Sequence, residues 1–278
     1  MRESAWFPGH MAKARDAISR TRSVADFFLV VLDARIPHAS RKFDLSRLAP
    51  LHKCIFCLNR SDLACEDTTD DWLRWFSSQG LVAEKTRAVA GQGLSRLRRL
   101  LASRKEEILE KRSAKGRKDR TFSVIVVGMP NVGKSSLLNS LGGVGSAATG
   151  RKPGITRGPQ WIRTKQGFSI LDTPGILTPG RLELDDIWKL HACGILPDEK
   201  ADPVETASLL WDPANRRASG SSVPDQAGQG DLEGLGKALG FLKRGGSVDI
   251  ERTAQHFLKE FRAGKLGRLT LEAPEDDL

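Results

Sequence analysis

The chain has 278 residues, which is enough to bury one full core and to carry a smaller second domain. Its 44 lysines and arginines outnumber its 34 acidic residues, a balance that favours a polyanionic partner such as RNA but also suits a merely solvated surface. The sequence has no run of about 18 apolar residues and no apolar signal core near its start, so we expect a cytoplasmic protein without a membrane span.

The first part of the chain alternates predicted helices and strands. A basic amphipathic helix is expected over residues 9–23, and the apolar runs Phe27–Ala34 and Cys54–Leu58 are typical of strands covered on both faces. Cys54 and Cys57 are interpreted as buried side chains, since no second close pair or neighbouring histidines complete a zinc set. The next elements are a helix at 68–80 with a Thr68–Asp71 capping box, a weaker strand at 81–89, an arginine-rich helix at 92–109 and a basic linker at 111–120.

A strand, a glycine-rich loop and a helix then follow in direct succession. Val124–Val127 predicts the strand, Gly128–Ser135 has the pattern GxxxxGKS, and Ser135–Leu141 continues as the helix. Two later strands near 160–164 and 168–171 are expected to pair antiparallel. The alternation predicts an α/β fold, a mostly parallel sheet with helices on both faces.

After about residue 177 only helical patterns remain. We therefore predict a nucleotide-binding domain at 1–177 and a small all-helical C-terminal domain at 178–278. The expected helices are 182–195, 202–211, 232–243 and 247–263, and the segment 213–230, rich in Ser, Gly, Pro and Gln, is expected to be a mobile loop.

The glycine-rich loop is suited to hold phosphates. Its glycines let backbone N–H groups wrap the phosphate oxygens, and the N-terminus of the following helix adds its positive dipole end. Lys134 would reach the β- and γ-phosphates, and the Ser135 hydroxyl would bind Mg²⁺. The alternative is a chance glycine-rich turn. The expected nucleotide contacts are Asn131, Val132, Gly133, Lys134, Ser135 and Ser136, with Lys134 also counted as catalytic.

Two later motifs would complete the phosphate site. Asp172 closes a predicted strand and begins Asp-Thr-Pro-Gly, so its carboxylate is expected to hold Mg²⁺. Gly175 could present its N–H to the γ-phosphate as a catalytic contact, and Thr156 is the candidate second hydroxyl for Mg²⁺. Read alone, Asp172–Gly175 could also be a strand-ending turn.

A guanine-reading motif, Asn59-Arg60-Ser61-Asp62, follows one of the predicted strands. The Asp62 carboxylate can accept the N1–H and the exocyclic amine of guanine, a donor pair that adenine lacks, and so selects GTP over ATP. Asn59 would bond the base edge and brace neighbouring loops, and Arg60, where lysine is usual, could cover the base plane. The alternative is a turn after a strand. A second base-contacting loop, with a looser match, is expected at Arg87 and Ala88.

The order of these motifs is unusual. In an ordinary small GTPase the guanine motif comes last, whereas here it precedes the phosphate loop and Asp172–Gly175, so a circularly permuted domain is expected. The ordered set resembles the circularly permuted GTPases of the YlqF type, the ribosome biogenesis GTPase A family. The resemblance covers nearly the whole chain except 213–230. It includes Trp6–Met11, Asp33–Pro37, Pro153–Thr156 and Gly264–Arg268, and it departs at Arg60 and at Ala88, where a serine is common.

The resemblance implies a P-loop GTPase that acts late in assembly of the large ribosomal subunit and binds its rRNA, with hydrolysis stimulated by that subunit. Asp172–Gly175 leads within a few residues into the helical domain, so nucleotide state could control ribosome binding. Two rivals stay open: an RNA-binding protein that uses GTP mainly as a structural ligand, and an ATP-using enzyme, which Asp62 disfavours. RNA contacts are expected in the Arg96–Arg120 region or at Lys243, Arg244, Lys259, Arg262, Lys265 and Arg268, unless these are only solvated charges.

Two further residues matter because Ile176 stands where many GTPases carry a water-positioning glutamine. Within the resemblance, His10 is the candidate catalytic replacement, although a histidine at a helix start could equally cap or pack. Similar GTPases with an apolar residue after this motif use K⁺, so the side-chain carbonyl of Asn131 is a candidate K⁺ ligand. The alternative is that Asn131 only stabilises the turn of the loop.

Overall fold

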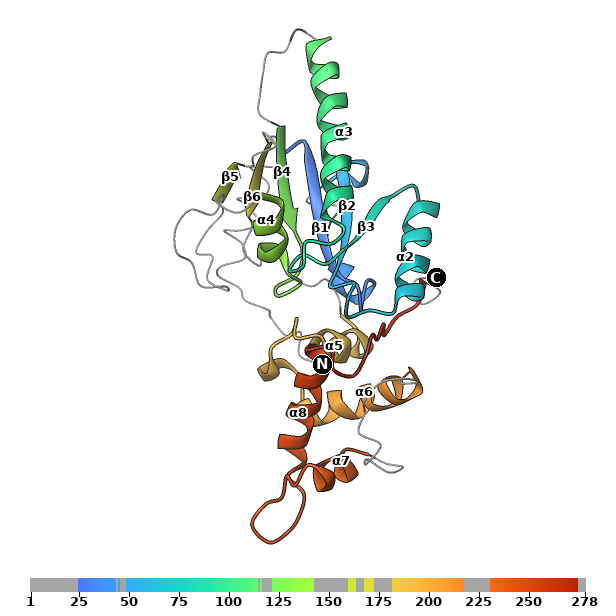
Figure 1. Cartoon of the computed structure of the whole chain (residues 1–278), viewed down its shortest axis with the longest axis vertical. Coiled ribbons are helices and arrows are strands. Elements are labelled where there is room, and N and C mark those ends of the chain that lie inside the picture. The colour runs from blue at the N-terminus through green and yellow to red at the C-terminus, as the bar shows by residue number, and fades with distance from the viewer. Residues whose placement is uncertain are drawn as a thin grey trace.

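In the described part of the chain, six strands form one sheet in the order β3-β2-β1-β4-β6-β5, and among them β5 alone runs antiparallel to its neighbour (Figure 1). The computed structural model describes residues 25–43, 45, 49–114, 116, 122–142, 160–163, 168–172, 182–217 and 231–274. The strands are β1 (Phe27–Asp33), β2 (Cys54–Asn59), β3 (Val82–Thr86), β4 (Phe122–Val127), β5 (Gln160–Arg163) and β6 (Phe168–Asp172).

The central strands are apolar on both faces because helices cover both faces. Phe56 of β2 packs on Phe76 of α2 (Glu66–Ser78), with ring centroids 4.8 Å apart. The guanidinium of Arg104 in α3 (Leu94–Ser113) lies 5.9 Å from the ring centroid of Phe27 in β1. Phe56 is paired with Val30, and side chains alternate along a strand, so Phe27 and Phe56 face opposite sides of the sheet. The predicted mostly parallel sheet with helices on both faces is confirmed.

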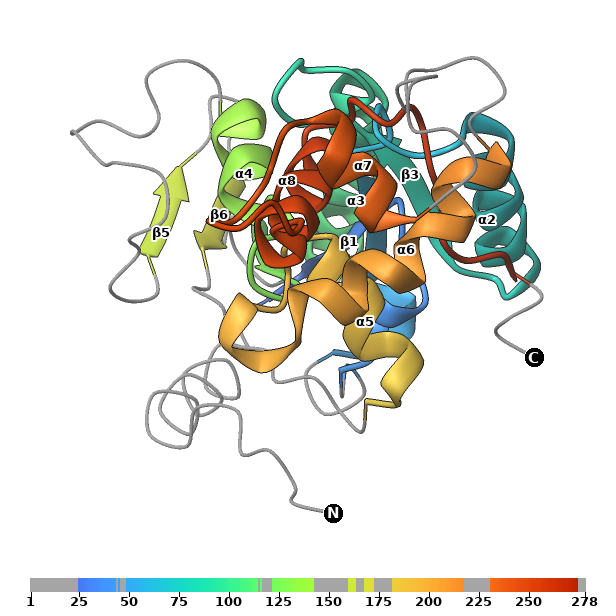
Figure 2. The same cartoon turned by 90° about the horizontal axis from the view of Figure 1, so that it is seen from below.

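The later helices form a bundle at one end of the sheet (Figures 1 and 2). The amphipathic helix α8 supplies its centre, because Ala254, Phe257, Leu258 and Phe261 are buried on one face and Gly264 follows with a φ of +77°. The bundle consists of α5 (Leu184–Ala192), α6 (Pro203–Arg217), α7 (Leu232–Ala238) and α8 (Ile250–Arg262).

The segment after α8 returns to the sheet and ends beside α2 (Figure 1). The main-chain N–H of Leu269 donates to the carbonyl of Leu63 at 2.9 Å. The N–H of Leu271 donates to the carbonyl of Arg35 at 2.8 Å, and the indole of Trp72 donates to the carbonyl of Glu272 at 3.2 Å. The last described residues therefore brace the loops that follow β1 and β2.

Several helix boundaries differ from the sequence prediction. The predicted helix at 232–243 is too long, because α7 ends at Ala238 and Leu242 instead forms an antiparallel bridge with Val248. Helix α2 begins at Glu66, so the proposed Thr68–Asp71 capping box is wrong. Glu66 and Asp67 already lie in the first turn, where acidic side chains favour the helix dipole. Helix α3 runs on to Ser113 and shortens the predicted linker at 111–120; Arg112 is held by an ion pair with Asp26.

The predicted loop at 213–230 is wrong for its first residues, because α6 passes through Pro213 and ends at Arg217. Pro213 has no N–H to donate to the carbonyl of the exposed Leu209, so one helical hydrogen bond is lost. Ala214, the residue after the proline, is fully buried. Burial thus outweighs the lost bond. Residues 218–230 lie outside the described part, as does the predicted helix at 9–23.

A membrane-spanning helix needs sufficient length and an apolar character. Among the described residues, no helix is apolar over a stretch long enough to cross a bilayer.

Cys54 and Cys57 are both buried in β2, where the residues between them, Ile55 and Phe56, are apolar and buried too. Burial raises the pKa of both thiols, that of Cys54 to about 12. This supports their interpretation as core side chains.

Candidate nucleotide-binding site

The predicted motifs meet at the carboxyl edge of the sheet. Asn59 ends β2 and is in register with Asp33 at the end of β1 and with Thr86 at the end of β3. Asp172, at the end of β6, is in register with Val126, two residues before the phosphate loop. Parallel strands bring their carboxyl ends to one edge, where ligands of open α/β sheets bind.

The phosphate loop has no room for side chains at two of its glycines. A Cβ at Gly128 would lie 2.4 Å from the carbonyl oxygen of Val31, and one at Gly133 would lie 2.3 Å from Nδ2 of Asn59. Gly133 also has a φ of +96°. The backbone can therefore follow this path only with glycine at both positions. A loop of this shape can surround phosphate oxygens with its N–H groups.

Lys134 and the serines after it lie where α4 (Lys134–Gly142) begins. The Lys134 ammonium is held over the loop by the carbonyls of Gly128 and Met129, at 3.0 and 2.7 Å. Ser135 is exposed and Ser136 is half-buried at the start of the same helix. A helix N-terminus with an ammonium and an exposed hydroxyl fits a Mg²⁺-bound polyphosphate.

Asn59 joins the guanine motif to both neighbouring loops. Its Nδ2 donates to the carbonyl of Val132 at 2.9 Å, and its Oδ1 accepts the N–H of Ala88 at 3.2 Å and the hydroxyl of Thr86 at 3.3 Å. Asn59 is almost fully buried. It thus takes the bracing role that the sequence predicts, through its side chain.

The predicted base-reading residues lie together. Arg87 Nε forms an ion pair with Asp62 Oδ2 at 3.2 Å, and Ser61 donates to the carbonyl of Thr86. Ala88 is buried, and its carbonyl accepts the hydroxyl of Ser140 in α4. The two predicted base loops are therefore adjacent.

Arg60 extends toward the phosphate loop and the helical bundle. Its guanidinium donates to the main-chain carbonyl of Asn131 at 2.7 Å and to Asp33 Oδ2 at 3.1 Å. These bonds direct the guanidinium to the phosphate loop and to the buried Asp33, and they do not show the base-covering role suggested by the sequence.

Several predicted residues lie outside the described part of the chain. They are His10, Thr156 and Gly175. For Asp172 the structure gives the strand position alone.

A buried pair and a helix-end turn behind the loop were not recognised as part of the site from the sequence. Arg35 holds Asp33 with two bonds of 3.0 and 2.9 Å, and both side chains are fully buried. Burial opposes ionisation of Asp33, but the charges of Arg35 and Arg60 outweigh it and its pKa is lowered. The turn after α5 accepts Arg35 at the carbonyl of Cys193 and the Asn131 amide at that of Gly194. In the sequence, the buried pair was indicated by the motif Asp33-Ala34-Arg35 and the turn by the glycine that follows α5, Gly194.

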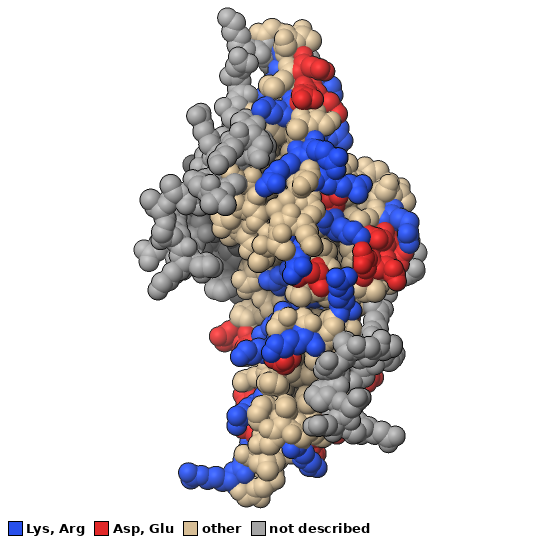
Figure 3. Space-filling view, in the orientation of Figure 1, with Lys and Arg blue, Asp and Glu red and all other residues tan. Residues whose placement is uncertain are grey.

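Several arginines of α3 already have partners within the chain, although Arg96 stays largely exposed. Arg96 pairs with Glu84 at 2.9 Å, Arg98 donates to the carbonyl of Ser140, and Arg104 pairs with Glu107. Figure 3 shows basic side chains along this helix, interspersed with acidic ones. This group is therefore less available to a polyanion than its sequence suggests.

The C-terminal basic group is divided. Arg262 donates to the carbonyls of His191 and Ala192, while Lys265 and Arg268 pair with Glu260 and Glu66. In the described part of the chain Lys243, Arg244 and Lys259 are exposed and lack an acidic partner. Lys243 and Arg244 lie on the loop between α7 and α8, where the N–H of Lys243 donates to the carbonyl of Ser247; this loop projects at the end of the molecule away from α3 (Figures 1 and 3).

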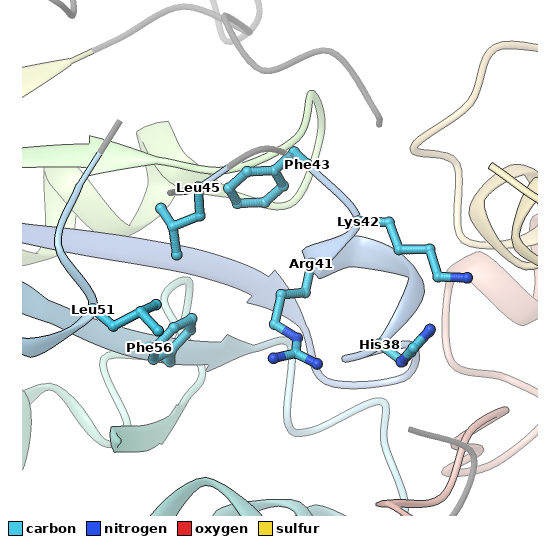
Figure 4. Close-up of a pocket in the computed structure, with 7 residues that line it drawn as sticks. All are labelled: His38, Arg41, Lys42, Phe43, Leu45, Leu51 and Phe56. Atoms are coloured by element: carbon cyan, nitrogen blue, oxygen red, sulfur yellow. The ribbon is translucent and has the colours of Figure 1, made fainter. Parts of the chain in front are cut away.

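A pocket of about 300 Å³ lies elsewhere, between the segment after β1 and the start of β2 (Figure 4). It contains none of the predicted nucleotide-binding residues. Its lining is apolar except at one side and consists of His38, Arg41, Lys42, Phe43, Leu45, Leu51 and Phe56.

Comparison with known proteins gives one consistent result. Residues 123–200 match the family model described as 50S ribosome-binding GTPase. A protein of Bacillus cereus named ribosome biogenesis GTPase A is 33% identical over 98% of this chain and 94% of its own length. Its namesake in Thermotoga maritima is 33% identical over 98% of this chain and 95% of its own. The GNP-bound structure of YlqF from T. maritima matches with a TM-score of 0.66 and 30% identity, over 95% of this chain and 99% of that one.

Proposed function

The chain belongs to the ribosome biogenesis GTPase A family, a family of circularly permuted P-loop GTPases, and we propose that it acts late in assembly of the large ribosomal subunit. In this proposal the nucleotide state controls its binding to rRNA and the ribosome. Binding of GTP and GDP and hydrolysis of GTP follow from the family. The cytoplasm is the proposed place of action, and assembling ribosomal particles are the proposed partner.

The observation that carries the proposal is the contact between the phosphate loop and the helical bundle. Asn131 Nδ2 donates to the carbonyl of Gly194, directly after α5, at 3.1 Å. If the phosphate loop moves on hydrolysis, this hydrogen bond would change the position of the turn after α5, and so of the helical bundle, directly. We assign the GTPase domain to 1–177 and the RNA- or ribosome-binding helical domain to 178–278.

Binding to particles tests the control by nucleotide. Large-subunit particles are sedimented with the protein in the presence of a non-hydrolysable GTP analogue or of GDP, at one salt concentration. We expect at least about tenfold tighter binding in one state, which corresponds to about 1.4 kcal/mol of coupling. Equal affinities in the two states would remove the control from the proposal.

Turnover with purified subunits separates the enzyme from its rival. We expect the large subunit to stimulate hydrolysis and the small subunit to leave it unchanged. A protein that used GTP mainly as a structural ligand would hydrolyse it equally slowly with either. Competition by ATP at equal concentration would instead favour an ATP-using enzyme.

The proposed roles at the phosphates follow the geometry where it is described. Lys134 and the N–H groups of the loop bind the phosphates, and Ser135 would hold Mg²⁺ together with Asp172 and Thr156. Mg²⁺ bound there would neutralise charge on the phosphate oxygens. Gly175 would donate its N–H to the γ-phosphate and His10 would position water; Ile176 offers no side chain for that task.

K⁺ is proposed as a second cation at Asn131. The Asn131 side chain is exposed at the surface of the loop, and its amide donates through Nδ2, which leaves Oδ1 as an acceptor. A cation at this place would offset charge developing near the bridging oxygen of the phosphates.

For rRNA we favour the C-terminal basic group over α3. Lys243, Arg244 and Lys259 are exposed without an acidic partner among the described residues, whereas the α3 arginines are mostly paired. Phosphate contacts by these side chains would make binding fall steeply as salt rises.

A further inference from the structure

Arg60 and Asn131 share an uncommon backbone conformation and touch each other. Among the described residues they alone, apart from glycines, have positive φ, at 60° and 59°. Such a conformation persists in larger residues where surrounding contacts hold it. Here the contact is direct, because Arg60 Nη2 donates to the main-chain carbonyl of Asn131 at 2.7 Å.

The other end of the Arg60 guanidinium is anchored in the core. Nη1 lies 3.1 Å from Asp33 Oδ2 and 3.4 Å from the carbonyl oxygen of Cys193. Asp33 is fully buried and is itself held by two bonds from Arg35. The anchor is therefore fixed, and motion of the Arg60 side chain is restricted at one end.

Cys193 belongs to a turn that gathers bonds from several elements. Its carbonyl accepts Arg35 at 3.2 Å, and the neighbouring carbonyl of Gly194 accepts the Asn131 side chain. Arg262 of α8 donates to the carbonyl of Ala192 at 3.1 Å. The turn Ala192–Gly194 is thus the junction of α5, α8, the end of β1 and the phosphate loop.

We propose that Arg60 is a positioning residue for GTP hydrolysis, which sets the phosphate loop at Asn131 according to the position of this turn. Its planar guanidinium donates to the loop and to the turn at the same time through two separate nitrogens. A lysine ammonium is a single point on a flexible stem and cannot span both acceptors. Arginine at this position therefore links loop geometry to the helical bundle, and the inference deepens the proposed control by nucleotide, on which it rests.

The test compares full-length Arg60→Lys with the native protein and with Arg74→Lys, a matched exchange at an exposed ion pair on α2. Without ribosomes, in KCl, we expect Arg60→Lys to lower kcat about tenfold and to raise the K⁺ concentration for half-maximal rate. GDP affinity, read by a fluorescent GDP analogue, should change by less than about threefold because Asp62 and Asn59 remain. Arg74→Lys should match the native protein in each measurement.

Two results would overturn the proposal. One is an unchanged kcat and K⁺ dependence in Arg60→Lys. The other is a parallel loss of kcat, GDP affinity and melting temperature, which would mark Arg60 as merely structural. These readouts need no ribosome, so they are independent of whether particles distinguish GTP from GDP. If particles bind both states equally while Arg60→Lys loses turnover as expected, the control by nucleotide fails and the positioning role stands.

Discussion

The side-chain amide of Asn59 donates to the main-chain carbonyl of Val132 across 2.9 Å, and this bond ties the base-reading motif to the phosphate loop. The same side chain accepts the N–H of Ala88. Recognition of the base and of the phosphates is therefore mechanically joined through one buried residue. A change at Asn59 is therefore expected to affect both halves of the site.

Replacement of Asn59 by alanine should damage stability and binding together. The carbonyl of Val132 and the N–H of Ala88 would lose their partner inside the protein, at a cost of about 2–4 kcal/mol. We expect GTP affinity to fall at least about tenfold. Urea unfolding and nucleotide titration measure the two effects, with Ser78→Ala, at an exposed helix end, as the control. Native stability in the variant would contradict the bracing role.

Gly133→Ala should abolish tight nucleotide binding. The new Cβ would meet Asn59 Nδ2 at 2.3 Å, in a backbone with φ of +96°. Gly80→Ala is a suitable control, because Gly80 also has a positive φ, +68°, but open space around it. The control should lose only about 1 kcal/mol of stability and keep its GDP affinity. If both variants bind GDP equally well, the phosphate loop can accommodate a side chain at Gly133 and the proposed steric constraint is wrong.

The choice of monovalent cation should affect hydrolysis through Asn131. We expect replacement of KCl by NaCl at equal ionic strength to slow GTP turnover in the native protein and to matter much less in Asn131→Ala. The reason is that Na⁺ is smaller and would fit a site shaped for K⁺ poorly. Equal turnover in the two salts would contradict the K⁺ proposal and would leave Lys134, Mg²⁺ or the ribosome to compensate the charge.

His10→Ala tests the proposed water-positioning side chain. We expect ribosome-stimulated turnover to fall by about 10²-fold or more, since a positioned acid–base group contributes about that much. Circular dichroism and GDP affinity should remain native. Full stimulation in a well-folded variant would show that His10 only caps or packs.

Salt dependence should locate the rRNA contacts. The double variant Lys243→Ala, Arg244→Ala should reduce the slope of log affinity against log salt by about 1.5 for an rRNA fragment. Arg74→Ala, Lys237→Ala removes the same charge from exposed ion pairs and should leave the slope unchanged. An identical slope in all three proteins would place the contacts elsewhere.

The carboxylate of Glu272 should make stability depend on pH. It is 2% exposed, and burial raises its pKa from 4.5 to about 7. Lys189 at 3.7 Å and the N–H groups of His38 and Ala39 lower the pKa, while the charge of Asp186 raises it. Because the folded pKa is the higher one, the folded state holds the proton more tightly. The stabilisation is complete below about pH 4.5 and is lost as pH rises through about 7.

Urea unfolding of the native protein and Glu272→Gln from pH 5 to pH 8 measures this effect. We expect the native protein to lose up to about 3 kcal/mol relative to the variant across that range. The glutamine keeps the shape of the side chain and does not titrate. A constant difference between the two proteins at every pH would show that Glu272 ionises as an exposed carboxylate does.

How much of this arrangement the sequence predicts depends on the range of the contacts. The strands ending at Asn59, Val127 and Asp172 follow from local apolar runs, and the loop path follows from its glycines. The direction of Arg60 does not follow, because it depends on Cys193, 133 positions away along the chain. Likewise, α6 continues through Pro213 because Ala214 is buried by other helices, a fact that local propensity does not contain.

The return of the C-terminal segment to the base-reading loop has a consequence for synthesis. The carbonyl of Leu63, one residue after Asp62, receives its hydrogen bond from Leu269. A growing chain on the ribosome has thus made its whole sheet and its phosphate loop before the partner of this loop exists. The base-reading loop therefore gains this support only after Leu269 has left the ribosome, and we expect a nascent chain that ends before Leu269 to hold guanine nucleotide less firmly than one that includes it.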